Sequence, residues 1–190
     1  MAPDLTNDSS VRKIVVIGAG AAGLMAAAEA AERGASVVLL EKNGKTGVKI
    51  LMSGGTRCNI TQDTDAKGIV AAFGSGGRFL QKSVGTFGPS DVIALFERNG
   101  VATKVESTGK VFPVSDRALH VRDALHQRAV DAGVEIRLRT PVSALARDGD
   151  QWVVATDSNP IRCDRVIVTA GGKSYPGCGT TGDAYAWLHQ

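Results

Sequence analysis

The fold is decided by residues 12–41, which read RKIVVIGAGAAGLMAAAEAAERGASVVLLE. Residues 12–17 are two basic residues followed by a continuous run of Val and Ile, which predicts a strand buried on both faces of a parallel sheet. Residues 21–33 are rich in Ala, Leu, Met and Glu, and predict a helix that ends at Gly34. Residues 36–40 predict a second buried strand. Together these segments predict a βαβ unit and hence an α/β fold.

The turn between the first strand and the helix carries three spaced glycines that fit G-x-G-x-x-G. In this context Gly18 allows the tight turn, Gly20 lets the backbone approach a pyrophosphate, and Gly23 brings helix and strand close. The helix begins at Ala21 and Ala22, and its unpaired N–H groups would face the phosphates. The turn therefore predicts a dinucleotide site in a Rossmann-like fold. A Rossmann unit that holds no ligand stays open as the alternative.

Glu41 closes the second strand, 21 residues after Gly20. A carboxylate at this place can accept hydrogen bonds from both ribose hydroxyls of an adenosine. It would also repel a 2′-phosphate, so NADP is disfavoured here. Glu41 is thus the predicted adenosine-binding acid.

The next segment, residues 42–61, is irregular and rich in Gly, Ser and Thr. An NAD-binding fold usually continues quickly to its next helix, whereas a long polar loop with bare backbone and cations can wrap an extended cofactor. This segment favours FAD over NAD, with a solvated loop as the alternative. The candidate cofactor-binding residues in it are Lys42, Lys49, Ser53, Gly54, Gly55, Arg57, Cys58 and Asn59.

The rest of the chain predicts further α/β structure. Residues 62–140 predict a helical and β insert, including a helix from an N-cap at Ser115 to Ala132. Residues 142–163 predict a small antiparallel β-meander with a turn at residues 148–150. Residues 165–190 predict a return strand and a last helix over 181–190. The strand ends in small residues, so Ala170 and Gly171 are candidate cofactor contacts. Asp183 either binds a flavin ribityl or caps the last helix, and capping is favoured.

Composition excludes several classes of protein. The 190 residues carry 22 Lys or Arg and 19 Asp or Glu, and this net charge of +3 without a basic run does not indicate a nucleic-acid or anionic-membrane surface. The longest apolar run is too short for a membrane span, and residues 1–11 predict a disordered leader, not a secretory signal. The three cysteines form no CxxC, which favours a reduced, cytoplasmic setting.

The sequence does not identify catalytic residues. It shows no grouping typical of a metal site or a catalytic triad, and its three histidines are not convincing acids or bases. Cys58 follows Arg57, which would favour a thiolate. No neighbouring cysteine could complete a dithiol, however, so a packing role for Cys58 is preferred.

Five motifs in this order resemble the BaiN/YhiN-like FAD-dependent oxidoreductases, also known as the aminoacetone-oxidase family. They are residues 17–27 with 41–42, 53–61 (SGGTRCNIT), 109–115 (GKVFPVS), 168–176 (VTAGGKSYP) and 181–185 (TGDAY). Two positions depart from the family pattern, since Thr56 and Ala184 stand where many members have glycine.

The resemblance implies a flavoprotein of the two-dinucleotide-binding-domain type, with FAD as cofactor and a small molecule as substrate. It covers the first half of such a protein, so the chain is expected to be a truncated portion that binds FAD weakly alone. The chain shows no separate NAD(P)H-binding domain, so any NAD(P)H donor would dock transiently. A non-catalytic nucleotide-binding module and an NAD-dependent dehydrogenase remain alternatives.

Overall fold

A computed structural model describes residues 11–188, which form two compact units. Unit 1 comprises the residues up to Gly44 and those from Ala129 onward, and unit 2 comprises Lys45–Arg128. Each unit has its own sheets, and each is described by itself.

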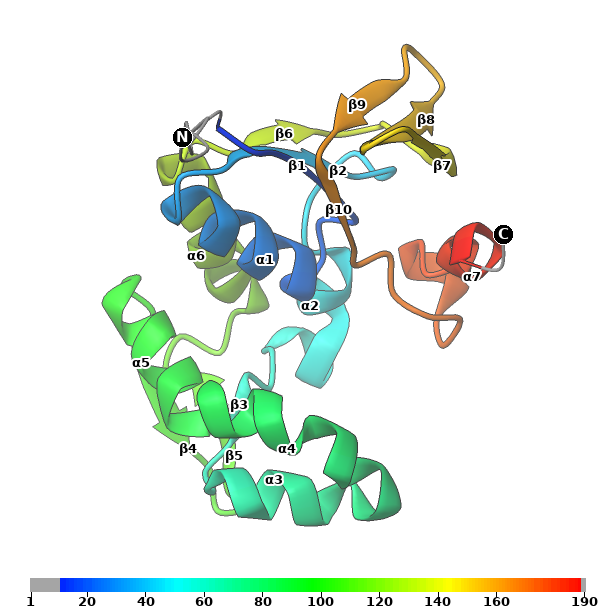
Figure 1. The fold of residues 1–190 in the computed structure, drawn as a ribbon. Coiled ribbons are helices and arrows are strands. Elements are labelled where there is room, and N and C mark those ends of the chain that lie inside the picture. The colour runs from blue at the N-terminus through cyan, green and yellow to red at the C-terminus, as the bar shows by residue number, and fades with distance from the viewer. Residues whose placement is uncertain (1–10, 189–190) are drawn as a thin grey trace, which may run out of the picture. The chain divides into compact units, whose positions relative to one another are not determined.

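The centre of unit 1 is a four-stranded parallel sheet of order β10-β1-β2-β6 (Figure 1). Its strands are β1 (Lys13–Ile17), β2 (Ser36–Leu40), β6 (Glu135–Arg137) and β10 (Arg165–Val168). β1 pairs with β2 from Lys13 opposite Ser36 to Ile17 opposite Leu40, and with β10 on its other side. The carboxyl ends of these strands therefore share one edge, where α/β sheets bind ligands.

The central strands of this sheet are apolar because both of their faces are covered. Helix α1 (Ala21–Glu32) packs on one face through Leu24, Ala27 and Ala28. The antiparallel meander β7 (Val142–Asp148), β8 (Gln151–Thr156) and β9 (Ile161–Cys163) covers the other, in one core cluster with β1 and β2. The buried members of that cluster are Val15, Ile17, Val38, Leu40, Leu145, Val154, Ile161 and Cys163.

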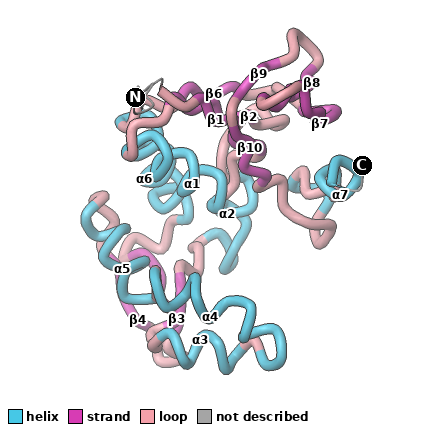
Figure 2. Tube along the Cα trace, in the orientation of Figure 1, coloured by secondary structure: helices cyan, strands magenta, loops and turns pink. Residues whose placement is uncertain are grey.

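Unit 2 combines short helices with a few short strands (Figure 2). These strands form a small antiparallel sheet of order β3-β5-β4. Its strands are β3 (Thr61–Gln62), β4 (Thr103–Val105) and β5 (Lys110–Pro113). Its helices are α2 (Val48–Met52), α3 (Ala66–Ala72), α4 (Gly77–Thr86) and α5 (Pro89–Arg98), with 3₁₀ turns at Ser53–Thr56 and Gly74–Gly76. Helix α6 (Ala118–Asp131) runs across the boundary, and unit 1 ends with a 3₁₀ turn at Pro176–Cys178 and α7 (Asp183–Leu188).

The predicted βαβ unit and β-meander are confirmed, whereas two local predictions are wrong and one helix was missed. Residues 42–61 are not irregular throughout, because they contain α2 and a 3₁₀ turn. Helix α3 was not predicted. Ser115 does not cap α6, which begins at Ala118, and its Oγ instead lies 2.9 Å from Nδ1 of His120. Ten of the eleven predicted leader residues, and the last two of the predicted final helix, lie outside the described residues.

Candidate functional site

The glycine turn after β1 is shaped by contacts that exclude side chains. Gly18 adopts φ +98°, and a Cβ built on it would lie 2.8 Å from the carbonyl oxygen of Thr169. A Cβ on Gly23 would lie 1.8 Å from the carbonyl oxygen of Gly18. Both positions therefore need glycine for the strand, the helix and the end of β10 to meet.

Thr169 fastens the end of β10 to this turn. Its Oγ1 lies 2.9 Å from the carbonyl oxygens of both Ile17 and Gly18, which share its one hydroxyl proton, and its backbone N–H donates to the carbonyl of Ile17. Ala170 follows directly, and its Cα would lie 3.0 Å from a Cβ on Gly18. The structure thus brings the predicted Ala170 next to the predicted glycine turn.

The start of α1 is open where a phosphate would need space. A Cβ built on Gly20 would meet nothing within 4 Å, and no acidic side chain lies in the first turn of α1. The first hydrogen bond of the helix runs from the backbone N–H of Leu24 to the carbonyl of Gly20. The N–H groups of Ala21 and Ala22 come before this bond, and both residues are exposed. This arrangement of N–H groups at a helix N-terminus fits the pyrophosphate of a dinucleotide.

The carboxylate of Glu41 is turned toward the glycine turn, although the residue is only 8% exposed. Its Oε2 accepts the backbone N–H of Ala19 at 2.8 Å. Its Oε1 accepts two hydrogen bonds from Asn43, one from the backbone N–H and one from Nδ2, each at 2.8 Å. A carboxylate offers about four acceptor positions. Three are occupied by the protein, so one position on Oε2 is left for a ligand, fewer than the two ribose contacts expected.

Lys42 and Asp183 are held together by an ion pair. Nζ of Lys42 donates to Oδ2 of Asp183 and to Oγ1 of Thr181, both at 2.7 Å, and Thr181 donates to the other carboxylate oxygen. The hydrogen bond from Lys42, followed by that from Thr181, lowers the pKa of Asp183 below its usual value. Asp183 is the first residue of α7, so the pair joins the end of β2 to the start of that helix.

Gly171 adopts φ +76°, and a Cβ on it would lie 2.7 Å from Cγ2 of Thr180. The chain therefore turns sharply after Ala170 and stays within unit 1. Ten of the predicted site residues belong to unit 1: Gly18, Gly20, Ala21, Ala22, Gly23, Glu41, Lys42, Ala170, Gly171 and Asp183. The remaining predicted residues belong to unit 2.

The predicted loop in unit 2 is built from left-handed residues. Gly54 and Gly55 adopt φ +56° and +64°, and Thr56 and Cys58 adopt φ +71° and +66°. A Cβ on Gly54 would lie 2.8 Å from the backbone nitrogen of Asn59. Thr56 is a β-branched residue in a region that favours glycine, so its backbone is strained.

Arg57 is engaged by two carboxylates of unit 2. Its guanidinium pairs with Glu106 at 2.6 Å and with Asp116 at 3.3 Å, and lies 4.1 Å from the ring centroid of Phe112. The hydrogen bond to Glu106 is the main reason why the pKa of Arg57 is raised. Lys104, more than Arg57, lowers the pKa of Asp116. A phosphate or flavin near Arg57 would compete with these partners.

Cys58 is buried, and burial is the main reason why the pKa of its thiol is raised. This environment fits the packing role preferred from the sequence and disfavours a thiolate beside Arg57. Ser53 donates its hydroxyl to the carbonyl of Ile50 at 2.9 Å. The amide of Asn59, oriented to satisfy its neighbours, donates to the carbonyl of Thr61 at 2.9 Å. Lys49 lies in α2.

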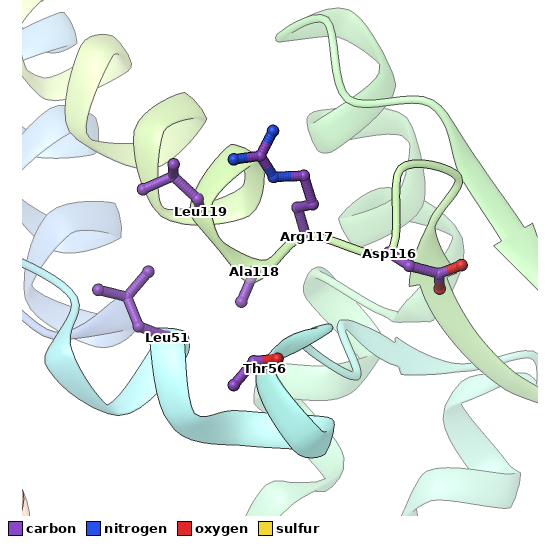
Figure 3. A pocket seen from close by; sticks show the side chains of 6 residues that line it. All are labelled: Leu51, Thr56, Asp116, Arg117, Ala118 and Leu119. Carbon is purple, nitrogen blue, oxygen red and sulfur yellow. The ribbon is translucent and has the colours of Figure 1, made fainter.

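A pocket of about 270 Å³ also lies in unit 2 (Figure 3). Leu51 and Thr56 line it from the predicted loop, Asp116 and Arg117 line it from the segment before α6, and Ala118 and Leu119 line it from the first turn of α6. Its carboxylate, on Asp116, is already paired with Lys104 at 2.5 Å. The pocket was not predicted, because its walls come from segments 60 residues apart.

Two residues that organise the site were missed by sequence reasoning. Thr169 locks the glycine turn, and Asn43 binds the Glu41 carboxylate. For Thr169 the only signal was a hydroxyl at the end of the predicted return strand. For Asn43 the sequence carried no such signal, because a polar residue shortly after a strand is typical of any loop. Within residues 11–188, no three His, Cys, Asp or Glu side chains are placed to hold a metal, and no helix suffices in length and hydrophobicity for a membrane span.

Comparison with known proteins places this geometry in context. The Rossmann-domain profile of HI0933-like proteins matches residues 12–190. The chain is 32% identical over 176 residues to the ribosomal RNA dihydrouridine synthase of Escherichia coli strain K12, which is 93% of this chain and 43% of that protein. It is also 32% identical over 178 residues, with the same shares, to the 3-dehydro-bile acid delta(4,6)-reductase of Clostridium scindens. The chain thus spans less than half the length of these relatives.

A solved structure shares the fold at lower identity. Thermovibrio ammonificans THI4 superposes with a TM-score of 0.55 and 15% identity, over 84% of this chain and 57% of that one. At this identity the likeness concerns the fold alone.

Proposed function

This chain belongs to the HI0933-like family of Rossmann-domain proteins, and from that premise we propose that it is the FAD-binding part of a flavin-dependent oxidoreductase. The observation that carries the proposal is the open helix start at Gly20 with the buried Glu41 carboxylate turned toward it. An amide-rich helix end fits the pyrophosphate, and an acid at the next strand end fits the adenosine ribose.

Different residues of unit 1 bind different parts of the cofactor in this proposal. Gly20 with the amides of Ala21 and Ala22 takes the pyrophosphate, and the free position on Oε2 of Glu41 takes a ribose hydroxyl. Thr169 keeps the turn in the shape that this requires. When bound, FAD would supply hydride transfer at its N5 atom, which no side chain can provide.

The names of the two curated relatives point to one reaction class. Dihydrouridine is uridine with two hydrogens added across a ring double bond next to a carbonyl, and a delta(4,6)-reductase of a 3-dehydro compound reduces double bonds near a carbonyl. For the protein to which this chain belongs we propose the same class. A hydride and a proton add across a carbon–carbon double bond conjugated to a carbonyl, and the reduced flavin is oxidised in return. NAD(P)H is the proposed transient donor that reduces it again.

The substrate class has two candidates, a free small molecule and a base within RNA. A small molecule follows from the resemblance and from the bile-acid relative. RNA is favoured by a feature that the chain-wide charge hides, since unit 2 has 12 Lys or Arg against 7 Asp or Glu, a formal charge of +5. Its segment 66–90 has no acidic residue and exposes Phe73 and Phe79, at 62% and 89%. Basic side chains with exposed aromatic rings are typical of nucleic-acid surfaces.

The test is a titration of the 190-residue chain with FAD and, separately, NAD, followed by calorimetry and flavin fluorescence. We expect FAD to bind and NAD to bind more weakly, and Glu41→Ala to weaken FAD about 10-fold or more, because a hydrogen bond to a charged group is lost. Glu135→Ala is the control, as this exposed acid pairs with Arg137 away from the turn. If neither nucleotide binds, or NAD binds better, the proposal is wrong.

Catalysis is tested on the same preparation. FAD-loaded protein is reduced without oxygen and mixed with an unsaturated 3-oxo steroid or with a uridine-containing ribosomal RNA fragment. Flavin reoxidation with either compound supports the reaction class and identifies the substrate class. Bound flavin that neither compound reoxidises would favour the non-catalytic alternative.

A further inference from the structure

We propose that Asn43 is a positioning residue that dedicates Oε2 of Glu41 to the ligand, and thereby determines selectivity for an adenosine with a free 2′-hydroxyl. The inference rests on the proposed FAD site, but it concerns a side chain that the sequence motifs do not include. Asn43 reaches the ligand only through Glu41.

The geometry gives Asn43 control over one carboxylate oxygen. Both of its N–H donors, on the backbone and on Nδ2, lie 2.8 Å from Oε1 of Glu41. Two donors fill the acceptor positions of one carboxylate oxygen. Oε1 is therefore unavailable to a ligand, whereas Oε2 faces the glycine turn and keeps one position beside the amide of Ala19.

Asn43 can do this because its own backbone is fixed. Its carbonyl accepts the N–H of Arg139 at 3.0 Å, and the carbonyl of Glu41 accepts the N–H of Thr140 at 2.9 Å. The segment that carries both side chains is thus hydrogen-bonded to the strand end after β6. A carboxylate held from two sides loses little further entropy when a ligand binds.

Asn43 also joins the acid to the turn after Pro176. Its Nδ2 lies 3.5 Å from the carbonyl of Cys178, and a Cβ on Gly179 would lie 2.8 Å from the same nitrogen. The amide side chain is therefore packed between Glu41 and that turn. A shorter side chain would leave Oε1 without its second donor and the carboxylate free to rotate.

A 2′-phosphate is disfavoured because the carboxylate that faces the ribose cannot turn away. The neighbouring cations do not offset this charge. Lys42 is paired with Asp183, and the guanidinium of Arg139 lies over Gly44, where a Cβ would meet it at 3.4 Å. With the carboxylate released, a phosphate at the 2′ position would be tolerated better.

The experiment compares the unsubstituted chain with Asn43→Ala, Asn43→Asp and the control Asn159→Ala, an exposed asparagine after β8. Circular dichroism and thermal unfolding check the fold. The probes are FAD, ADP and adenosine 2′,5′-bisphosphate, titrated by calorimetry from pH 5 to 8. Binding, not turnover, is measured.

We expect Asn43→Ala to bind ADP and FAD about 10-fold more weakly and to lose most of the preference for ADP over the bisphosphate. A general loss of packing would weaken both adenosine ligands alike and leave that ratio unchanged. We expect Asn43→Asp to bind ADP better at pH 5 than at pH 8 by a factor of ten or more, because two adjacent carboxylates must share a proton.

The results separate the two levels of inference. If the unsubstituted chain binds none of the probes, the proposed FAD site fails and takes the role of Asn43 with it. If it binds FAD while Asn43→Ala keeps both affinity and selectivity, or Asn43→Asp shows no dependence on pH, the site stands and the role of Asn43 is refuted.

Discussion

At the scale of single residues, the backbone strain at Thr56 is expected to lower the free energy of unfolding, and this can be tested. A non-glycine residue in the left-handed region costs about 1–2 kcal/mol, and Thr56 adopts φ +71°. Thr56→Gly removes this cost but gives the unfolded chain more freedom, worth about 0.4–1 kcal/mol. We expect the free energy of unfolding to rise by about 0.5–1 kcal/mol in urea denaturation. Thr108→Gly, at an exposed position without positive φ, should lower it; equal losses in both variants would show that Thr56 is not strained.

The residues of the site differ in how far the sequence predicts them. Glu41 could be placed at the glycine turn, because it closes the second strand of a βαβ unit, 21 residues after Gly20. The bonds from Asn43 could not, since they depend on a rotamer and on the turn near Cys178, 135 residues away. The partners of Arg57 were missed for the same reason, because Glu106 and Asp116 approach it only through the small sheet of unit 2.

At the scale of elements, predictability follows the strength of local patterns. The segments β1, α1 and β2 were predicted because buried strands and an alanine-rich helix differ sharply in composition. Helix α3 was missed, since it is seven residues long, contains Gly68 and buries none of its residues. Its one signal is the N-cap Asp65, whose carboxylate accepts the N–H of Gly68 at 2.8 Å. Helix α2, with five residues, is too short to show a helical period.

The connection between β2 and α7 should depend on pH. Because Lys42 and Thr181 lower the pKa of Asp183, the pair stabilises the fold above the unfolded pKa of Asp183, and this stability is lost as pH falls through its lowered folded value. Asp183→Asn should therefore cost stability at pH 6 and little at pH 3. The cost is at most about 1 kcal/mol, since Lys42 and Asp183 are 32% and 41% exposed.

The measurement for this pair is urea unfolding of both proteins at each pH. The exposed Asp157, in the turn after β8, provides Asp157→Asn as the control. A difference between the unsubstituted chain and Asp183→Asn that stays constant from pH 6 to pH 3 would show that the carboxylate contributes nothing through its charge.

At the scale of the whole molecule, charge is divided between the two units. Unit 2 carries a formal charge of +5, and unit 1 has 10 Lys or Arg against 12 Asp or Glu. The net charge of +3 for the chain is therefore the sum of a basic unit and a slightly acidic one. The argument that this small net charge does not indicate a nucleic-acid surface applies to the whole chain and does not extend to unit 2 alone. The charge division becomes visible only once the units are known from the fold, because the basic residues of unit 2 are spread over 84 positions and form no run in the sequence.

The RNA candidate can be tested through the salt dependence of binding. Each neutralised phosphate contributes about −0.7 to the slope of log affinity against log salt for single strands. Replacing Lys67, Arg78 and Lys82 by Gln should therefore flatten that slope by about 2, as measured by fluorescence anisotropy with a uridine-containing RNA between 50 and 200 mM salt. The matched control replaces Arg12, Arg147 and Arg165 of unit 1, which are also exposed. Equal slopes for both triple variants would leave the acid-free segment of unit 2 without a role in RNA binding, and a free small molecule would then be the favoured substrate.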